Sequence, residues 1–191
     1  MARRIWREEL LPHFQYILQS NDQPRDGNIY VMYHGTTVEA AKQILLHGFM
    51  QSADGMLGSG VYVSRDIGKA ARYPLGDKSK QVILKLSVNV GKVIKIDCQG
   101  HPLQKIWHYC GYDTAWVPAS CDMVPSQLEE DCIWDPERIK VVQIAYIPDQ
   151  QLLFELYPYI LKYVIRDTII TEFYKTLNFP ELFWRYGVYF G

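Results

Sequence analysis

The chain has 191 residues, of which 48% are hydrophobic and 21% are charged, so it resembles one globular domain and not a disordered or collagen-like chain. The formal net charge is −1, so the chain as a whole does not attract nucleic acid or anionic membrane. The aromatic content is 14%, and 12 of the 26 aromatic residues fall within positions 152–191. The aromatic excess therefore belongs to the C-terminal end.

The first 28 residues are expected to form an amphipathic helix and then a turn-rich lead-in. Apolar residues recur at intervals of three or four positions: Trp6, Leu10, Phe14 and Ile17. Turn-forming residues then fill positions 20–28, so the main domain is expected to begin at Ile29.

Cysteine usage and the N-terminal composition indicate a compartment. The four cysteines include no CxxC pair, and the N-terminus lacks the apolar core of a signal peptide. We therefore expect a cytoplasmic protein with reduced thiols.

The first part of the main domain reads as strand, turn and helix. Residues 29–33 predict an apolar strand, and Thr36 or Thr37 can cap a following helix that ends at Gly48. A glycine-rich loop is expected at residues 51–60. A short strand over 61–64 and a helix from Asp66 to Pro74 follow.

The second part predicts mainly strands. Residues 81–89 read as a strand, with 93–97 as its hairpin partner. A short helix is expected over 101–109, and residues 113–127 have few periodic signals. Two further strands, 131–134 and 139–147, flank a turn at Asp135 and Pro136.

The C-terminal residues 150–191 read as an aromatic-rich helical extension, with Pro158 in a first-turn position. Charged residues interrupt its apolar stretch, which therefore does not predict a membrane span. We expect it to pack on the domain or on a second copy of the chain, and a partner- or membrane-binding face is the alternative. The predicted organisation is 1–28, 29–149 and 150–191, in an α+β fold with a mainly antiparallel split sheet and short flanking helices.

Three short segments carry residue types that suit ligand binding. They are residues 33–36 (Tyr-His-Gly-Thr), 55–64 (Gly-Met-Leu-Gly-Ser-Gly-Val-Tyr-Val-Ser) and 69–73 (Lys-Ala-Ala-Arg-Tyr). A glycine at a strand end lets a ligand approach the backbone closely. Each segment alone is weak evidence, because a lone histidine at a strand end or a glycine-rich loop more often has a structural role.

The order and spacing of these segments resemble the donor site of the poly(ADP-ribose) polymerase-type ADP-ribosyltransferases. Residues 130–136 (Glu-Asp-Cys-Ile-Trp-Asp-Pro) look like the strand that carries this family's catalytic glutamate, and the resemblance covers about 120 residues. More narrowly, three blocks resemble the vertebrate virus-inducible family first described as grass carp reovirus-induced gene 2: residues 51–57, 100–105 and 128–132.

The resemblance implies NAD as co-substrate, no metal, and a role for each motif residue. His34 and Thr36 would contact the adenine-side ribose, and the Gly35 backbone would hold the nicotinamide amide. Tyr62 and Tyr73 would enclose the nicotinamide ring, since aromatic faces suit a planar, electron-poor ring. The catalytic set would be His34, Tyr62 and Glu130, and Lys69 would complete the NAD-binding residues.

Glu129 and Glu130 are adjacent, so either one is a candidate for the catalytic carboxylate. Strand alternation places Glu130 on one face and Asp131 on the other, with Glu129 on the side of Asp131 if the strand already runs there. The spacing to the Trp-Asp-Pro sequence favours Glu130, whereas a solvated acidic turn is the structural alternative.

Ala70 departs from the family pattern, in which a serine commonly follows the lysine. The missing hydroxyl removes one hydrogen bond to the carboxamide, worth about 0.5–1.5 kcal/mol. Weak NAD binding or slow turnover is expected to follow.

Two other groups of residues invite functional interpretations. Six basic residues between positions 65 and 85 could attract an anion, although a solvated helix face explains them more simply. Possible zinc ligands also occur, but their spacing matches no familiar zinc site. These ligands are Cys98, His101, His108 and Cys110.

The leading hypothesis is a mono-ADP-ribosyltransferase that modifies an unidentified protein or nucleic-acid acceptor, and the resemblance implies an antiviral role. A non-catalytic module that binds NAD or ADP-ribose is the main alternative, and Ala70 favours it. An RNA 2′-phosphotransferase shares a related fold, but it needs a basic tetrad that residues 60–64 (Gly-Val-Tyr-Val-Ser) do not supply.

Overall fold

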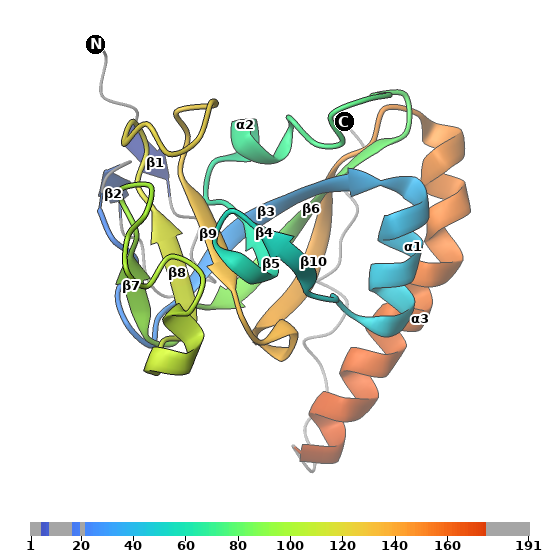
Figure 1. Ribbon diagram of the computed structural model, residues 1–191. Coiled ribbons are helices and arrows are strands. Elements are labelled where there is room, and N and C mark those ends of the chain that lie inside the picture. Colours follow the sequence, from blue (N-terminus) through green and yellow to red (C-terminus); the bar gives the residue numbers. More distant parts are fainter. Residues whose placement is uncertain (1–4, 8–16, 20–21, 175–191) are drawn as a thin grey trace.

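The computed structural model describes residues 5–7, 17–19 and 22–174, and its strands form a split, mainly antiparallel arrangement (Figure 1). One sheet has the order β10-β6-β3, built from β3 (Ile29–Thr37), β6 (Gln81–Asn89) and β10 (Ile139–Tyr146). A second sheet has the order β4-β5-β9-β8-β7, built from β4 (Ser52–Gly55), β5 (Gly58–Val63), β7 (Val93–Lys95), β8 (Thr114–Val117) and β9 (Glu130–Ile133). β7 and β8 run parallel, and the other neighbours are antiparallel. The predicted α+β class and split sheet are confirmed.

Helices flank the sheets, and α1 and α3 lie side by side at one end of the molecule (Figure 1). The Thr37 hydroxyl caps α1 by accepting a bond from the Ala40 N–H at 3.1 Å, and Gly48 ends the helix with φ 85°. The helical segments are α1 (Val38–His47), α2 (Ile67–Ala70), α3 (Gln150–Tyr174) and two 3₁₀ turns, Trp107–Cys110 and Pro136–Arg138.

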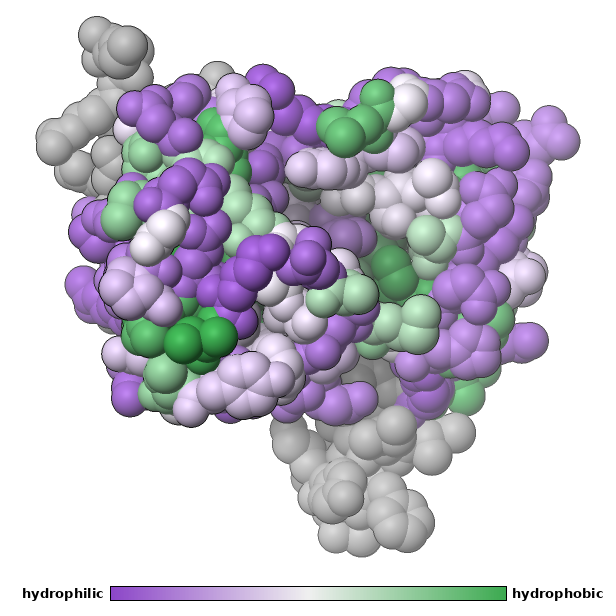
Figure 2. Space-filling view, in the orientation of Figure 1, coloured by the Kyte–Doolittle hydropathy of each residue, from purple (hydrophilic) through white to green (hydrophobic). Residues whose placement is uncertain are grey.

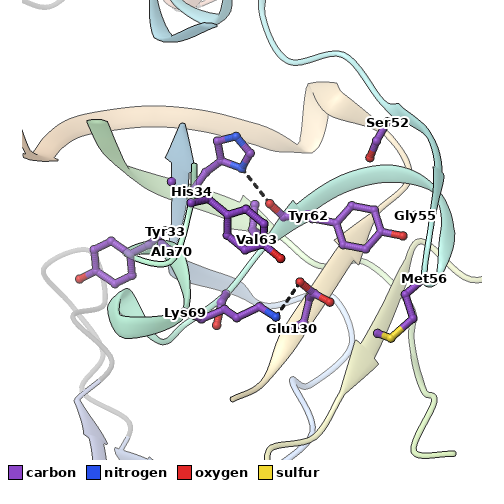
Figure 3. Close-up of a pocket in the computed structure, with 13 residues that line it drawn as sticks. Tyr33, His34, Ser52, Gly55, Met56, Tyr62, Val63, Lys69, Ala70 and Glu130 are labelled. Carbon is purple, nitrogen blue, oxygen red and sulfur yellow. Dashed lines mark hydrogen bonds and ion pairs between the residues drawn. The ribbon is translucent and has the colours of Figure 1, made fainter. Parts of the chain in front are cut away.

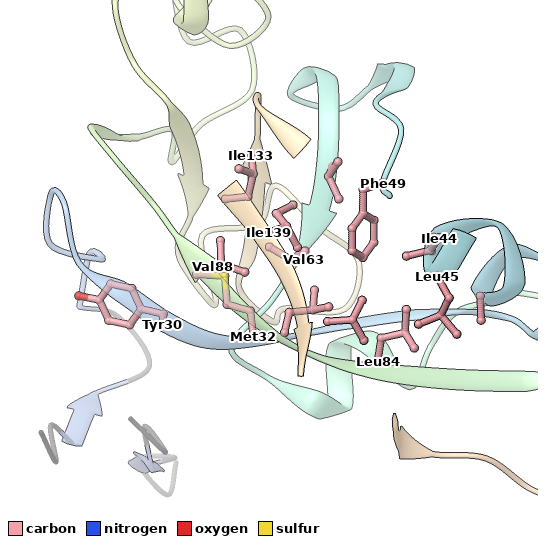
Figure 4. Close-up of a cluster of buried hydrophobic side chains, with 14 of the residues drawn as sticks. Tyr30, Met32, Ile44, Leu45, Phe49, Val63, Leu84, Val88, Ile133 and Ile139 are labelled. Atoms are coloured by element: carbon pink, nitrogen blue, oxygen red, sulfur yellow. The ribbon is translucent and has the colours of Figure 1, made fainter. Parts of the chain in front are cut away.

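The main core lies between the three-stranded sheet, β5 and the two long helices (Figure 4). Alternate residues of β3 and β6 enter it, as the period-two pattern of these strands requires. Leu45 of α1 and Leu156 of α3 are buried in the same cluster. A second cluster around Trp107 packs under β8 and β9, where the indole N–H donates to the Leu57 carbonyl at 2.6 Å.

Residues 150–166 of α3 pack on the domain, as one of the two expected arrangements predicts. The Tyr163 hydroxyl accepts a bond from the Val141 N–H at 2.9 Å, and Arg166 donates to the Leu46 carbonyl at 2.6 Å. Within the described part of the chain, no helix has the length and apolar character needed to cross a bilayer. Residues 175–191 lie outside the described residues.

The prediction of an N-terminal helix is wrong for the N-terminal residues that the structure describes. Residues 5–7 form β1 (Ile5–Arg7) and residues 17–19 form β2 (Ile17–Gln19), which pair antiparallel with Ile5 opposite Gln19. A spacing of three or four between a few apolar residues does not exclude such a pairing of distant segments. The positions between the two strands lie outside the described residues.

The expected hairpin of residues 81–89 and 93–97 is also wrong, because β7 pairs with β8 instead of β6. The chain leaves β6 at Gly91, and the Asp113 side chain accepts a bond from the Lys92 N–H at 2.8 Å. These contacts direct residues 93–95 toward β8, a strand that the sequence did not reveal.

Three smaller expectations need correction. The glycine-rich segment 51–60 forms the β4–β5 hairpin and not a loop, and 3₁₀ structure in the expected helix at 101–109 is confined to its C-terminal end. Pro158 lies inside α3, at its ninth residue, and not in the first turn.

Candidate functional site

A cavity of about 360 Å³ opens where β3, the β4–β5 hairpin, α2 and β9 meet. The space-filling view shows this face hollowed between the α2 segment and the hairpin (Figure 2). Of the seven motif residues named from the sequence, six line the cavity: His34, Gly35, Tyr62, Lys69, Tyr73 and Glu130. Thr36 lies on β3 but is not among the lining residues.

His34 is held by a backbone contact inside β3, which continues to Thr37 instead of ending at Tyr33 as expected. Its Nδ1 lies 2.8 Å from the Tyr62 carbonyl (Figure 3). Because a carbonyl can only accept, Nδ1 carries the proton in this contact. Burial lowers the pKa of His34 below its ordinary value of 6.5, so the ring is neutral at pH 7 and its Nε2 is an acceptor.

The Gly35 backbone faces away from β6 and toward the cavity. Bonds such as that from the Val90 N–H to the Asn28 carbonyl show that even-numbered residues of this segment pair with β6. Odd-numbered residues therefore point the other way, as Tyr33 does when it exchanges two backbone bonds with Ser64. Among the described residues, the Gly35 N–H and carbonyl have no hydrogen-bond partner, so one donor and one acceptor lie side by side at the cavity.

Gly35 is also required by packing, which the sequence did not reveal. A Cβ at this position would lie 1.8 Å from the Ala70 carbonyl oxygen, a distance that no side chain can occupy. The absent side chain therefore lets α2 approach β3 closely, while the lateral backbone groups of Gly35 remain available to a ligand.

Tyr62 is fixed in the cavity wall by its hydroxyl group. The hydroxyl donates to the Gly58 carbonyl at 2.8 Å and accepts from the Leu57 N–H at 2.9 Å. A Cβ on Gly55 would lie 2.1 Å from this hydroxyl, so the tyrosine ring occupies the space beside that glycine. Burial raises the pKa of Tyr62, so the phenol stays protonated and acts as a positioned aromatic surface.

Glu130 reaches the cavity from β9 and pairs with Lys69 from α2 (Figure 3). The Lys69 Nζ lies 3.0 Å from Glu130 Oε1, and the residues are 6% and 7% exposed. The cavity therefore contains a carboxylate held in place by a single ammonium group.

Glu129 lies on the other side of the strand, where Arg65 binds it. The Arg65 Nε donates to Glu129 Oε1 at 2.9 Å and its Nη2 donates to Oε2, so the guanidinium engages both carboxylate oxygens. Glu129 is 0% exposed and Arg65 5%. The structure thus places Glu130 in the cavity and Glu129 outside it, and neither belongs to a solvated acidic turn.

Asp131 shares the interior with this ion pair. Its side chain is 0% exposed, and neither carboxyl oxygen has a hydrogen-bond partner in the described part of the chain. Burial, followed by the nearby charge of Glu129, raises the pKa of Asp131 well above its ordinary value of 3.8. Asp131 is therefore a neutral acid at pH values between 3.8 and its raised pKa in the folded protein.

Sequence reasoning missed the structural importance of two basic residues. Arg65 and Lys69 were expected on a solvated helix face, but both are buried against carboxylates. Arg72, Lys78 and Lys80 are exposed, in agreement with that expectation. No sequence signal identified these partners, because the burial of Glu129 and Glu130 is set by the packed strand.

The cysteine near the cavity and the possible metal ligands are the remaining candidates for chemistry. Burial raises the pKa of the Cys132 thiol, which lies beside Tyr62 and is therefore a poor nucleophile. Within residues 5–7, 17–19 and 22–174, no group of three or more His, Cys, Asp or Glu side chains could hold a metal ion.

Comparison with protein families places this fold among those of the ADP-ribosyl-transferring enzymes. Residues 2–117 match the model of the poly(ADP-ribose) polymerase catalytic domain. The match covers more than half of the chain, which therefore belongs to this family. It contains His34, Gly35, Tyr62, Lys69 and Tyr73 and ends before Glu130. A search of curated proteins gave no match.

Proposed function

We propose that the protein is a mono-ADP-ribosyltransferase, which transfers ADP-ribose from NAD to a macromolecular acceptor and releases nicotinamide. The observation that carries this proposal is the placement of the Glu130 carboxylate in one cavity with the outward-facing Gly35 backbone and the Tyr62 ring. Members of the family use NAD as their substrate, and the cavity offers a contact for each part of its reactive end.

The Gly35 backbone suits the carboxamide of nicotinamide. A primary amide has one acceptor and two donors, and the Gly35 N–H and carbonyl supply the complementary donor and acceptor. Tyr62 and Tyr73 line the same cavity and offer aromatic faces to the ring. His34 offers its Nε2 as an acceptor for a ribose hydroxyl, since its Nδ1–H is already used by Tyr62.

Glu130 would act at the bond that breaks. When nicotinamide leaves with the bonding electrons, positive charge develops on the ribose, and a nearby carboxylate stabilises that charge more in the transition state than in the ground state. The acceptor nucleophile then forms the new bond to the ribose carbon and loses its proton. Lys69 holds the carboxylate ready before substrate binds.

The narrower parts of the proposal rest on resemblance. Transfer of a single unit is one of these narrower parts, and Glu130 is equally compatible with polymer formation. The three sequence blocks shared with the virus-inducible family support a cytoplasmic antiviral role. The acceptor would be a protein or a nucleic acid.

The proposal is tested by incubating the purified protein with NAD and a cell lysate. Nicotinamide release is measured by chromatography, and NAD labelled in its adenine moiety shows whether label enters the protein or the nucleic-acid fraction. Release together with label in one fraction is expected. Intact NAD and no label in either fraction would contradict transferase activity.

A non-catalytic module for NAD or ADP-ribose is the second candidate, and Ala70 favours it because its side chain offers no hydroxyl to the carboxamide. A module of this kind would gain thermal stability with NAD and with ADP-ribose, and it would release no nicotinamide. The same incubation therefore separates the two functions.

A further inference from the structure

We propose that Arg65 and Glu129 are positioning residues that determine which of the two adjacent glutamates enters the cavity. The inference rests on the proposed function, in which Glu130 is the reactive carboxylate. Arg65 lies two residues after the end of β5, and Glu129 directly precedes β9, so their ion pair joins the two strands at the edge of the cavity.

The Glu129 side chain is held by more contacts than an ordinary ion pair supplies. Its Oε1 accepts from the Arg65 backbone N–H at 3.0 Å and from Nε at 2.9 Å. Its Oε2 accepts from the Arg65 Nη2 and, at 3.2 Å, from the Trp116 indole N–H of β8. The carboxylate is thus bound by groups from β8 and from the segment that follows β5, the two strands that flank β9. These contacts fix the direction in which the side chain points.

The Glu129 backbone is held as well. The Ser64 hydroxyl donates to the Glu129 carbonyl at 2.9 Å and accepts from the Asp66 N–H at 3.0 Å. The same short segment continues into α2, whose Lys69 pairs with Glu130. Residues 64–69 therefore hold two consecutive glutamates on opposite sides of one strand.

This arrangement resolves an ambiguity in the sequence itself. A shift of one residue in a strand exchanges the side chains of its two faces, and here such a shift would put Glu129 into the cavity in place of Glu130. Positions 129 and 130 carry the same side chain, so this doublet itself does not disfavour the shifted state, although the shift would also exchange Cys132 and Ile133 between the two core clusters. The arginine contacts distinguish the two glutamates, since Lys69 alone can pair with either.

Stability alone does not account for this ion pair. Replacing a buried ion pair by apolar residues of similar size is often neutral or stabilising, because both charges lose their hydration. The best-attested use of such pairs is to specify one register among alternatives. At this position the register determines which carboxylate meets the substrate.

The test uses a double variant, Arg65→Met with Glu129→Leu, which removes both charges together. Steady-state nicotinamide release from NAD is measured with the full chain, and folding is checked by thermal unfolding. We expect kcat to fall about 10- to 100-fold, as for a misplaced catalytic group, with little change in the KM for NAD. A double variant that folds and retains the wild-type kcat would overturn the proposal.

A second variant covers the case in which the double variant does not fold. Ser64→Ala removes only the hydroxyl that binds the Glu129 carbonyl, and a lower kcat with unchanged KM is again expected. A matched control removes another ion pair, Arg138 with Asp113 at 2.9 Å, near the opposite end of β9. Arg138→Met with Asp113→Asn should leave kcat unchanged, and an equal loss in this control would show that any lost ion pair has the same effect.

Failure of the proposed function would be distinguishable from failure of this inference. If the wild type releases no nicotinamide, the transferase assignment is wrong. The distance between Lys69 and Glu130 is then compared in crystal structures of the wild type and the variants. The wild type should keep Lys69 Nζ near 3.0 Å from Glu130 Oε1, and the double or Ser64→Ala variant should separate them. An unchanged pair in these variants would overturn the positioning role without any reference to activity.

Discussion

Glu129 and Glu130 are neighbours in the chain, and the two sides of their strand give them different surroundings. Glu130 lies in an open cavity with one ammonium partner, which leaves carboxylate lone pairs available to a ligand. Glu129 lies in the interior, where arginine and indole groups bind both of its oxygens. Under the proposed function, the carboxylate on the cavity side acts on the substrate, whereas the carboxylate on the interior side holds the strand.

Removing the interior glutamate should have the largest effect on folding. Glu129→Ala leaves Arg65 buried without its carboxylate, which is expected to lower the free energy of unfolding by about 3–5 kcal/mol. Glu130→Ala should cost less, because the Lys69 ammonium can turn toward the open cavity and its water. Urea denaturation of both variants measures the difference, and equal losses would remove the distinction between the two sides.

On the interior side of the strand, Asp131 is expected to make the stability of the protein depend on pH. Its pKa is raised in the folded state, so its contribution to stability is complete below 3.8 and is lost as the pH rises toward the folded-state value. Asp131→Asn removes this loss. As the pH rises, the free energy of unfolding of the variant should therefore increase relative to that of the wild type, by at most about 1.4 kcal/mol per pH unit.

Thermal unfolding across the pH range measures this gain, which corresponds to about 2–4 °C in Tm for each kcal/mol. The two proteins should converge at acid pH. A constant difference at every pH would show that Asp131 is charged in the folded protein.

The smallest expected effect concerns the cavity side. Ala70→Ser restores a hydroxyl at a cavity-lining position and should tighten NAD binding by about 2- to 12-fold, the equivalent of one hydrogen bond. Ala71→Ser is the matched control, because Ala71 is adjacent to Ala70 in the chain but does not line the cavity. Calorimetric titration with NAD compares the two, and equal affinities would exclude Ala70 as a determinant of donor binding.

Elements determined by local patterns were predictable from the sequence. The bounds of β6 agree with its apolar run, and Thr37 and Gly48 cap α1 as their residue types predict. The parallel β7–β8 pair was not predictable, because its partners are set by contacts of Asp113 with a distant turn. Pairings of this kind depend on tertiary contacts that periodicity does not encode.

The candidate site likewise has residues that could be predicted from the sequence and residues that could not. The family resemblance in motif order and spacing implied a shared site for His34, Tyr62 and Glu130, and the structure brings these residues to one cavity. Their catalytic roles stay predictions. The partner of Glu129 was not predictable, since a basic residue near a helix is usually solvated and the burial of Arg65 depends on the packed strand.

The most direct test of the central claim compares the wild type with Glu130→Gln for both NAD binding and nicotinamide release. Glutamine retains the size of the side chain and removes the charge, so binding should change little while turnover falls about 100- to 1,000-fold. Thermal unfolding confirms that the variant is folded. Release at equal rates by the two proteins, or no release by the wild type, would contradict the assignment of Glu130 as the carboxylate that acts on NAD.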